Sequence, residues 1–313
     1  MNGLELSRAY YETFGRPMLE ERFPGLLPKI AIGLCGSGSE CWGYDDAVSR
    51  DHDFEPGFCL FLPGEDEIDR RTAFLLERAY ASLPAEFEGL TRSRMAPVGG
   101  QRHGVIRRAD FFRDKCGSPD GQLSLTDWLA APETLLAEAV NGEIFFDGDG
   151  AFSAIRERLA DMPGDVRKKK LAGRLILMKQ AGVYNYPRIL AHGEAGAAQL
   201  AVHAFAESAM HAVFLLNRRY MPYYKWRFRA MRDLSFGGGM ADALEFLLLS
   251  DNEPDTAKTK EAVIGDIGAL IVAEVGRQGL SDADGDDPEV HGYAVNGGIA
   301  DPALRNLHVL AAV

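Results

Sequence analysis

The stretch from Gly33 to Phe54, GLCGSGSECWGYDDAVSRDHDF, combines two kinds of groups that bind opposite charges. Its glycine-rich loop offers backbone N–H groups and two hydroxyls to phosphate oxygens, because glycine lets a ligand approach the backbone closely. This GSGS loop consists of Gly36, Ser37, Gly38 and Ser39. Asp51 and Asp53 share one face if their segment is a strand, where side chains alternate. Two adjacent carboxylates repel each other, and Mg²⁺ relieves that repulsion. The pattern therefore predicts a site for a nucleoside triphosphate bound with Mg²⁺.

Two familiar nucleotide motifs do not account for this stretch. No GK[ST] follows the glycines, as a P-loop requires, and no helical pattern follows them, as a dinucleotide fingerprint requires. A GSGS string alone is most often a turn, and a DxD pair alone is most often a solvated loop. Their occurrence together, between two apolar runs, favours the site. Arg50 is a candidate phosphate contact, with an ion pair to Asp51 or at the surface as the alternatives.

The surrounding sequence predicts a small β-sheet. Residues 29–36 and 57–63 are short apolar runs typical of strands, and 66–84 is amphipathic with helical spacing. Residues 102–112 indicate a third strand that runs into a helix, and 143–148 indicates one edge strand. The segment between Gly43 and the second strand is short and holds no helical pattern. We therefore expect a mixed sheet rather than a Rossmann crossover.

The C-terminal half has a different character. Residues 124–142 predict two short helices capped by Ser124 or Thr126. From Gly164 onward, apolar residues recur at helical spacing and are interrupted only by glycines and prolines, which predicts a helical bundle. The fold class is accordingly α+β, with a sheet-containing domain over residues 1–150 and a helical domain over 151–313.

Composition limits the class of protein. The chain has 313 residues and a net charge of −12, from 34 basic and 46 acidic residues. Such an acidic chain is not a general nucleic-acid coat, because phosphate contacts need clustered Lys and Arg. No signal peptide and no membrane-spanning run are apparent, and the four cysteines contain no CxxC pair, so we expect free thiols in the cytoplasm.

A second unusual stretch is RRYMPYYKWRFR, residues 218–229, which is rich in basic and aromatic residues. Lys225 could reach a triphosphate, and Tyr223 or Tyr224 could stack on a base. The alternative is an amphipathic helix with Trp226 in the core and the charges in water. The sequence supports the two interpretations about equally.

These motifs resemble known families. The GS loop with a nearby acidic pair resembles the polymerase-β-like nucleotidyltransferase superfamily. The strings GSGSECWGYDDAVSRDHDF, SLTDWLAAPETLL and LNRRYMPYYKW look like a bacterial family catalogued as domain of unknown function 4037. The likeness extends from about Leu34 to Leu234. It implies a nucleotidyltransferase domain followed by a helical domain, as in aminoglycoside nucleotidyltransferases.

The resemblance also implies roles for individual residues. By position, Ser37 binds nucleotide phosphate with Ser39 behind it, while Asp51 and Asp53 hold Mg²⁺. Many active members carry a third carboxylate on the next central strand, but HGVIRR has none, Asp110 lies just beyond it, and Glu40 belongs to the loop.

The expected activity is Mg²⁺-dependent transfer of a nucleoside monophosphate from a nucleoside triphosphate to an acceptor. A small-molecule acceptor is favoured over a protein or RNA, and no membrane partner is expected. The alternative is a catalytically silent nucleotide-binding protein whose helical domain docks a partner.

Overall fold

The computed structural model describes residues 1–46, 48, 54–92 and 102–313. The chain divides into two compact units, each described here by itself. The first unit comprises residues 1–123 and 135–161, and the second comprises residues 124–134 and 162–313. The predicted boundary at residue 150 places residues 124–134 in the sheet-containing domain, whereas the structure groups them with the second unit. As a boundary between functional domains, residue 150 stays a prediction.

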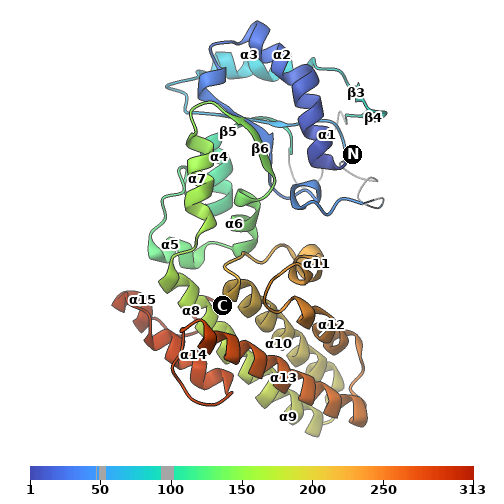
Figure 1. Ribbon diagram of the computed structural model, residues 1–313, viewed down its shortest axis with the longest axis vertical. Coiled ribbons are helices and arrows are strands. Elements are labelled where there is room, and N and C mark those ends of the chain that lie inside the picture. The colour runs from blue at the N-terminus through green and yellow to red at the C-terminus, as the bar shows by residue number, and fades with distance from the viewer. Residues whose placement is uncertain (47, 49–53, 93–101) are drawn as a thin grey trace. The chain divides into compact units, whose positions relative to one another are not determined.

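The first unit is built on a four-stranded mixed sheet with the order β5-β2-β1-β6 (Figure 1). β1 pairs antiparallel with β2 and with β6, and β2 pairs parallel with β5. Its strands are β1 (Ala31–Leu34), β2 (Cys59–Leu62), β5 (Gly104–Arg107) and β6 (Glu143–Asp147). The mixed sheet and the edge position of β6 confirm the sequence prediction. A separate hairpin consists of β3 (Glu86–Phe87) and β4 (Leu90–Thr91), which the sequence analysis did not identify.

Helices cover both faces of this sheet. They are α1 (Gly3–Tyr10), α2 (Arg16–Arg22), α3 (Arg70–Ala81), α4 (Arg108–Cys116), α6 (Glu133–Val140) and α7 (Ala151–Ala160). Gly15 and Pro17 predict a break in this helical stretch, but a π-helical segment, Tyr11–Gly15, joins α1 to α2 there. Pro17 lies in the first turn of α2, directly after the π-helical segment.

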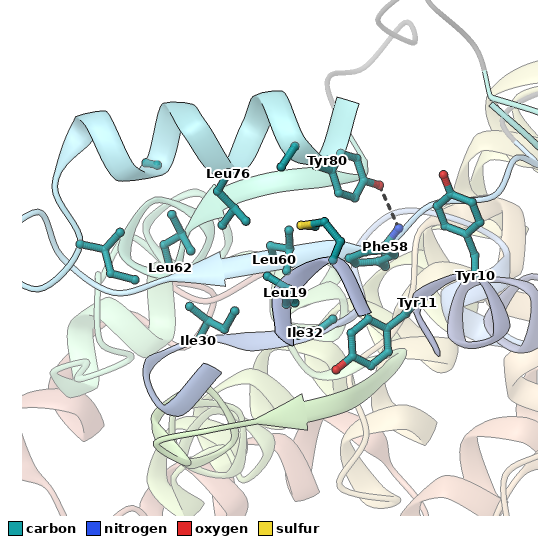
Figure 2. Close-up of a cluster of buried hydrophobic side chains, with 14 residues drawn as sticks. Tyr10, Tyr11, Leu19, Ile30, Ile32, Phe58, Leu60, Leu62, Leu76 and Tyr80 are labelled. Carbon is teal, nitrogen blue, oxygen red and sulfur yellow. Dashed lines mark hydrogen bonds between the residues drawn. The ribbon is translucent and has the colours of Figure 1, made fainter. Parts of the chain in front are cut away.

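Alternation along β2 determines what each face of the sheet packs against. Leu60 and Leu62 point to one face, where they meet side chains of α2 and α3 such as Leu19 and Leu76 (Figure 2). The Tyr80 hydroxyl accepts a hydrogen bond from the Phe58 N–H there, at 3.1 Å. Phe61 points to the opposite face and packs on aromatic rings of α4 and α7. Both faces of the sheet therefore pack against apolar side chains, and polar functional groups are expected at the ends of the strands.

The second unit consists of helices and turns. α8 (Gly164–Met178) packs against α10 (Ala195–Leu216) and α14 (Pro288–Gly297). The other helices are α5 (Leu125–Ala130), α9 (Tyr186–Ala191), α11 (Arg227–Arg232), α12 (Ala241–Leu249), α13 (Pro254–Arg277) and α15 (Pro302–Asn306), with a π-helical segment at Lys179–Asn185. Ser124 caps α5 with a capping box, as predicted.

Two features bear on where the chain resides. Among the described helices, α10 is long and apolar enough to cross a membrane by length and composition, but most of it is buried as a core helix. All four cysteines are buried free thiols, as predicted.

Candidate phosphate-binding loop

Four segments meet at one end of the sheet. The register pairs Gly33 with Cys59 and Cys59 with Gly104, so the end of β1 lies beside the beginnings of β2 and β5. β6 begins opposite Leu34, because Leu34 pairs with Glu143. The GSGS loop, which follows β1, therefore lies at the edge of the sheet where the segments before β2, β5 and β6 arrive. This convergence is the setting for the candidate site.

The first residue of the loop is fixed by a distant asparagine. Asn141, between α6 and β6, accepts a hydrogen bond from the Gly36 N–H at 2.9 Å and donates one to the Gly36 carbonyl at 2.7 Å. Gly36 has φ of +123°, a conformation that favours glycine. Arg156 on α7 in turn donates to the carbonyls of Val140 and Asn141. The loop conformation thus depends on a clamp more than one hundred residues away in the sequence, which the sequence analysis did not find.

The remaining loop residues present free donors. Within the described part of the chain, the N–H groups of Ser37, Gly38 and Ser39 donate no hydrogen bond. The Ser37 side chain is exposed and its hydroxyl likewise makes no hydrogen bond there. Consecutive unpaired N–H groups form a concave anion-binding surface. The loop can therefore contact oxygens of an anion through its backbone and through the Ser37 hydroxyl.

Glu40 closes the loop from inside. The side chain is buried, and the Ser39 hydroxyl donates a long contact of 3.5 Å to its Oε2. A Cβ atom on Gly38 would lie 2.0 Å from Glu40 Oε1, so any larger residue at this position would displace the Glu40 carboxylate. The carboxylate therefore lies directly beside the loop, and it would repel an anion bound there unless a cation or a proton offset its charge.

The residues that flank the loop in the sequence and across the sheet include three buried cysteines. These are Cys35, Cys41 and Cys59, and burial raises the pKa of the Cys35 thiol to about 12. Burial also raises the pKa values of the Cys41 and Cys59 thiols well above their ordinary range. These neutral thiols are packing groups, because only a thiolate is a good nucleophile or metal ligand.

The predicted acidic pair cannot be placed. Asp51, Asp53 and Arg50 lie outside the described residues. Of the acidic residues before them, Asp45 accepts the Gly3 N–H at the start of α1 at 2.8 Å, and Asp46 accepts the N–H of Val48 at 3.0 Å. Asp45 therefore links its segment to the start of α1, and Asp46 caps a local turn.

A carboxylate–histidine pair was missed. Glu55 Oε1 lies 3.6 Å from Nδ1 of His103, which immediately precedes β5. Both side chains are largely buried at the loop end of the sheet. Glu55 continues the alternation of Asp51 and Asp53 at the same spacing of two, and that signal could have found it. Among the described residues, no group of three or more His, Cys, Asp or Glu side chains is placed to hold a metal ion.

The third carboxylate that the resemblance to nucleotidyltransferases would require has no equivalent on β5. The strand residues are Gly-Val-Ile-Arg, without an acidic side chain. Asp110 lies in the first turn of α4 and pairs with Arg113 at 2.7 Å, where both side chains are exposed. Asp110 is thus a surface ion pair.

The basic and aromatic stretch lies in the second unit. Tyr223 and Tyr224 are exposed, with ring centroids 4.2 Å apart, and Lys225 Nζ lies 4.9 Å from the centroid of the Trp226 ring. Trp226 is half-buried, so this segment matches neither a core helix nor a fully solvated one. Because the GSGS loop belongs to the first unit, the expected contact of Lys225 and Tyr223 with a nucleotide stays a prediction.

One hollow of about 360 Å³ lies at the other end of β2. It is lined by Pro63 and Gly64, which follow the strand, and by apolar residues of α7. Two arginines also line it, but Arg108 pairs with Asp149 and Arg158 donates to the Asp120 carbonyl. A hollow with apolar walls and paired charges does not present the groups that phosphate chemistry needs.

Comparison with family models gives one match. The model described as Domain of unknown function (DUF4037) matches residues 128–227, which is less than half of the chain. The match supports the resemblance to that family, and it does not include the GSGS loop or the acidic pair. Comparison with curated proteins gives no match.

Proposed function

We propose that the protein is a Mg²⁺-dependent nucleotidyltransferase that transfers a nucleoside monophosphate from a nucleoside triphosphate to an acceptor. The observation that carries the proposal is the row of three unpaired N–H groups in the GSGS loop, held open by the Asn141 clamp. Free N–H groups at a strand end favour phosphate. The expected acidic pair, Asp51 and Asp53, follows this loop in the sequence. The match of residues 128–227 to the DUF4037 model supports the resemblance to that family.

The loop has a defined role in this proposal. The N–H groups of Ser37, Gly38 and Ser39, with the Ser37 hydroxyl, bind the triphosphate oxygens and orient the chain of phosphates. The acceptor oxygen then forms a bond to the α-phosphorus while the bond to the leaving pyrophosphate breaks. Asp51 and Asp53 are the residues proposed to hold Mg²⁺, which would offset negative charge between the phosphates.

Glu207 on α10 is a poor candidate for the general base. Its ion pair with Arg227, at 2.9 Å, contributes to lowering the pKa of its carboxyl although partial burial opposes this. A carboxylate with a lowered pKa is a weak proton acceptor near neutral pH. The acceptor that we favour is a small molecule rather than a protein or RNA, and the negative net charge makes RNA the least favoured.

The proposal is tested by binding. Isothermal calorimetry should detect Mg²⁺–nucleoside triphosphate binding to the native protein and no binding to the double variant Asp51→Asn with Asp53→Asn. Asp66→Asn, an exposed position in the same unit, is the matched control and should bind as the native protein does. Equal affinity of the native and double-variant proteins would remove the acidic pair from the site.

A second candidate function is a nucleotide-binding protein without catalysis. The specific observation in its favour is the absence of an acidic side chain on β5, together with the surface ion pair of Asp110. Metal-dependent release of pyrophosphate separates the two candidates, because only the transferase produces it. Binding without pyrophosphate release, over a panel of hydroxylated acceptors, would favour the silent protein.

A further inference from the structure

Six ionisable side chains from four helices gather in the second unit. Lys170 and Arg174 are four residues apart on α8, and Glu207 and His211 are four residues apart on α10, so each pair shares a helix face. Glu133 is the first residue of α6, and Arg227 is the first of α11. We name this group the polar cluster; its members are Glu133, Lys170, Arg174, Glu207, His211 and Arg227.

The inner part of the polar cluster is buried without hydrogen bonds. Glu133 lies 3.6 Å from the Lys170 ammonium and 3.6 Å from Nδ1 of His211, distances too long for hydrogen bonds. Each of the three residues is more than nine-tenths buried. The atoms that face each other across the Glu133–His211 contact are Glu133 Oε2 and His211 Nδ1, and neither has a partner within hydrogen-bond distance. Buried polar atoms in folded proteins are nearly always paired, so these two atoms indicate a position for another polar group.

Arg174 offers a second, independent observation, which is a partly buried cation without a bonded partner. Its side chain is half-buried, and within the described part of the chain it makes no hydrogen bond and no ion pair within 4.0 Å. Burial lowers the pKa of its guanidinium, while Glu133 and Glu207 raise it. A guanidinium keeps its charge in proteins and presents five donors in a plane. It is therefore a cation whose pKa both carboxylates of the polar cluster raise, although it is bonded to neither.

The charge of the polar cluster favours an anion. Three cations, Lys170, Arg174 and Arg227, face two carboxylates, which leaves one positive charge when His211 is neutral. The burial of His211 lowers its pKa and favours that neutral form. This local excess is unusual in a chain with a net charge of −12. Arg227 is already bound to Glu207, so Arg174 and Lys170 are the cations left to hold a ligand.

The unpaired carboxylate oxygen restricts the kind of anion. An anion that bonds to Glu133 Oε2 must donate the hydrogen bond, because an ionised carboxylate can only accept one. A carboxylate or sulfate ion near neutral pH has no donor. A phosphate group that keeps one proton has acceptor oxygens and a P–OH donor on the same atom.

We propose that the polar cluster is a binding site for a singly protonated phosphate group, either free phosphate or a phosphate monoester. Arg174 and Lys170 donate to its oxygens, and its P–OH donates to Glu133 Oε2. His211 Nδ1 contributes a further hydrogen bond in the tautomer that the ligand selects. This site lies wholly in the second unit, so it is independent of the GSGS loop and of the proposed transferase activity.

The test is equilibrium dialysis with radiolabelled inorganic phosphate at constant ionic strength near pH 6.5. We expect saturable binding to the native protein, and Arg174→Met should weaken it roughly ten- to a hundredfold, because a hydrogen bond to a charged group is lost. Arg277→Met is the matched control, since Arg277 is an exposed arginine on α13 outside the polar cluster. Ser37→Ala, in the other unit, should leave this Arg174-dependent binding unchanged.

Each outcome decides for or against the proposal. Equal binding by the native protein and Arg174→Met, or loss of the same binding in Ser37→Ala, would overturn it. Sulfate that competes as well as phosphate would overturn the role of the P–OH donor. If Arg174→Met fails to fold, Arg174→Lys keeps the charge but loses the planar donors, and unchanged binding in that variant counts against the site. A monoester such as glycerol phosphate, compared with free phosphate, identifies which source binds better.

Discussion

Replacing Asn141 with alanine should release the GSGS loop. In the native protein the Asn141 side chain makes two hydrogen bonds with Gly36, one accepted at 2.9 Å and one donated at 2.7 Å. Gly36 is buried, so water does not readily replace either bond. The alanine variant therefore leaves one N–H and one carbonyl of the backbone without partners, at a position whose φ of +123° has little other support.

The expected magnitude follows from these two bonds. Each neutral hydrogen bond contributes about 0.5–1.5 kcal/mol net, so Asn141→Ala should lower the free energy of unfolding by about 1–3 kcal/mol. Asn141→Asp keeps one acceptor but places carboxylate oxygen against the Gly36 carbonyl, so we expect a loss at least as large. Asn306→Ala is the control, because Asn306 is exposed on α15 and should change stability by less than about 0.5 kcal/mol.

Two measurements check this prediction. Urea denaturation gives the change in the free energy of unfolding, and hydrogen exchange followed by mass spectrometry reports the protection of the Gly36 N–H directly. We expect protection of the peptide containing Gly36 to fall in Asn141→Ala and to remain in Asn306→Ala. The reasoning is refuted if Gly36 stays protected and stability changes by less than about 0.5 kcal/mol. Neither measurement depends on nucleotide binding.

Three further predictions concern buried ionisable groups. Lys260→Met should lower the free energy of unfolding by about 2–4 kcal/mol in urea, because the fully buried Lys260 ammonium donates to three oxygens that would lose their donor; an equally stable variant would contradict this. Burial lowers the pKa of His211 below its ordinary value of 6.5, so the unfolded chain binds the proton first and stability should fall as the pH drops below about 6.5. His211→Gln should show less of that acid sensitivity between pH 7.5 and 5.5, and an unchanged pH profile would count against it. Burial raises the pKa values of all four cysteines, so the folded protein at pH 8 should react slowly with a thiol reagent and yield four thiols only in denaturant; rapid reaction of the folded protein would oppose this.

Local patterns in the sequence predict much of the sheet-containing part. The apolar runs at 29–36 and 57–63 contain β1 and β2, and the amphipathic segment at 66–84 contains α3. These elements are recognisable because period-two or helical spacing acts over a few neighbouring residues. The π-helical segment at Tyr11–Gly15 was read as a break, because glycine and proline close together are typical of a helix end. The structure overrides that tendency by burying Tyr11 and Gly15 against Phe58.

The candidate site was predicted less completely. Glycine and serine identify the loop from its own residues, but the partner of Gly36 is Asn141, and no local pattern links positions 105 residues apart. Asn141-Gly142 reads only as a turn before a strand. The same limit applies to the polar cluster: Glu133 and His211 look like a helix start and a lone histidine until α6 and α10 bring them within 3.6 Å. Helical spacing places Lys170 with Arg174, and Glu207 with His211, on one helix face, whereas their pairing between helices required the fold.

The segment that matches the family model contains both of these long-range partners. Residues 128–227 include Asn141, which holds the GSGS loop, and every member of the polar cluster from Glu133 to Arg227. Gly142, also in this segment, donates its N–H to the Cys41 carbonyl at 2.9 Å, so the turn before β6 contacts both the loop and the short helix that follows it. The loop that offers N–H groups therefore lies outside the matched segment, while the groups that fix its conformation lie inside it. A change within residues 128–227 should alter the proposed phosphate binding without touching a loop residue, and Asn141→Ala separates that indirect effect from the direct one in Ser37→Ala.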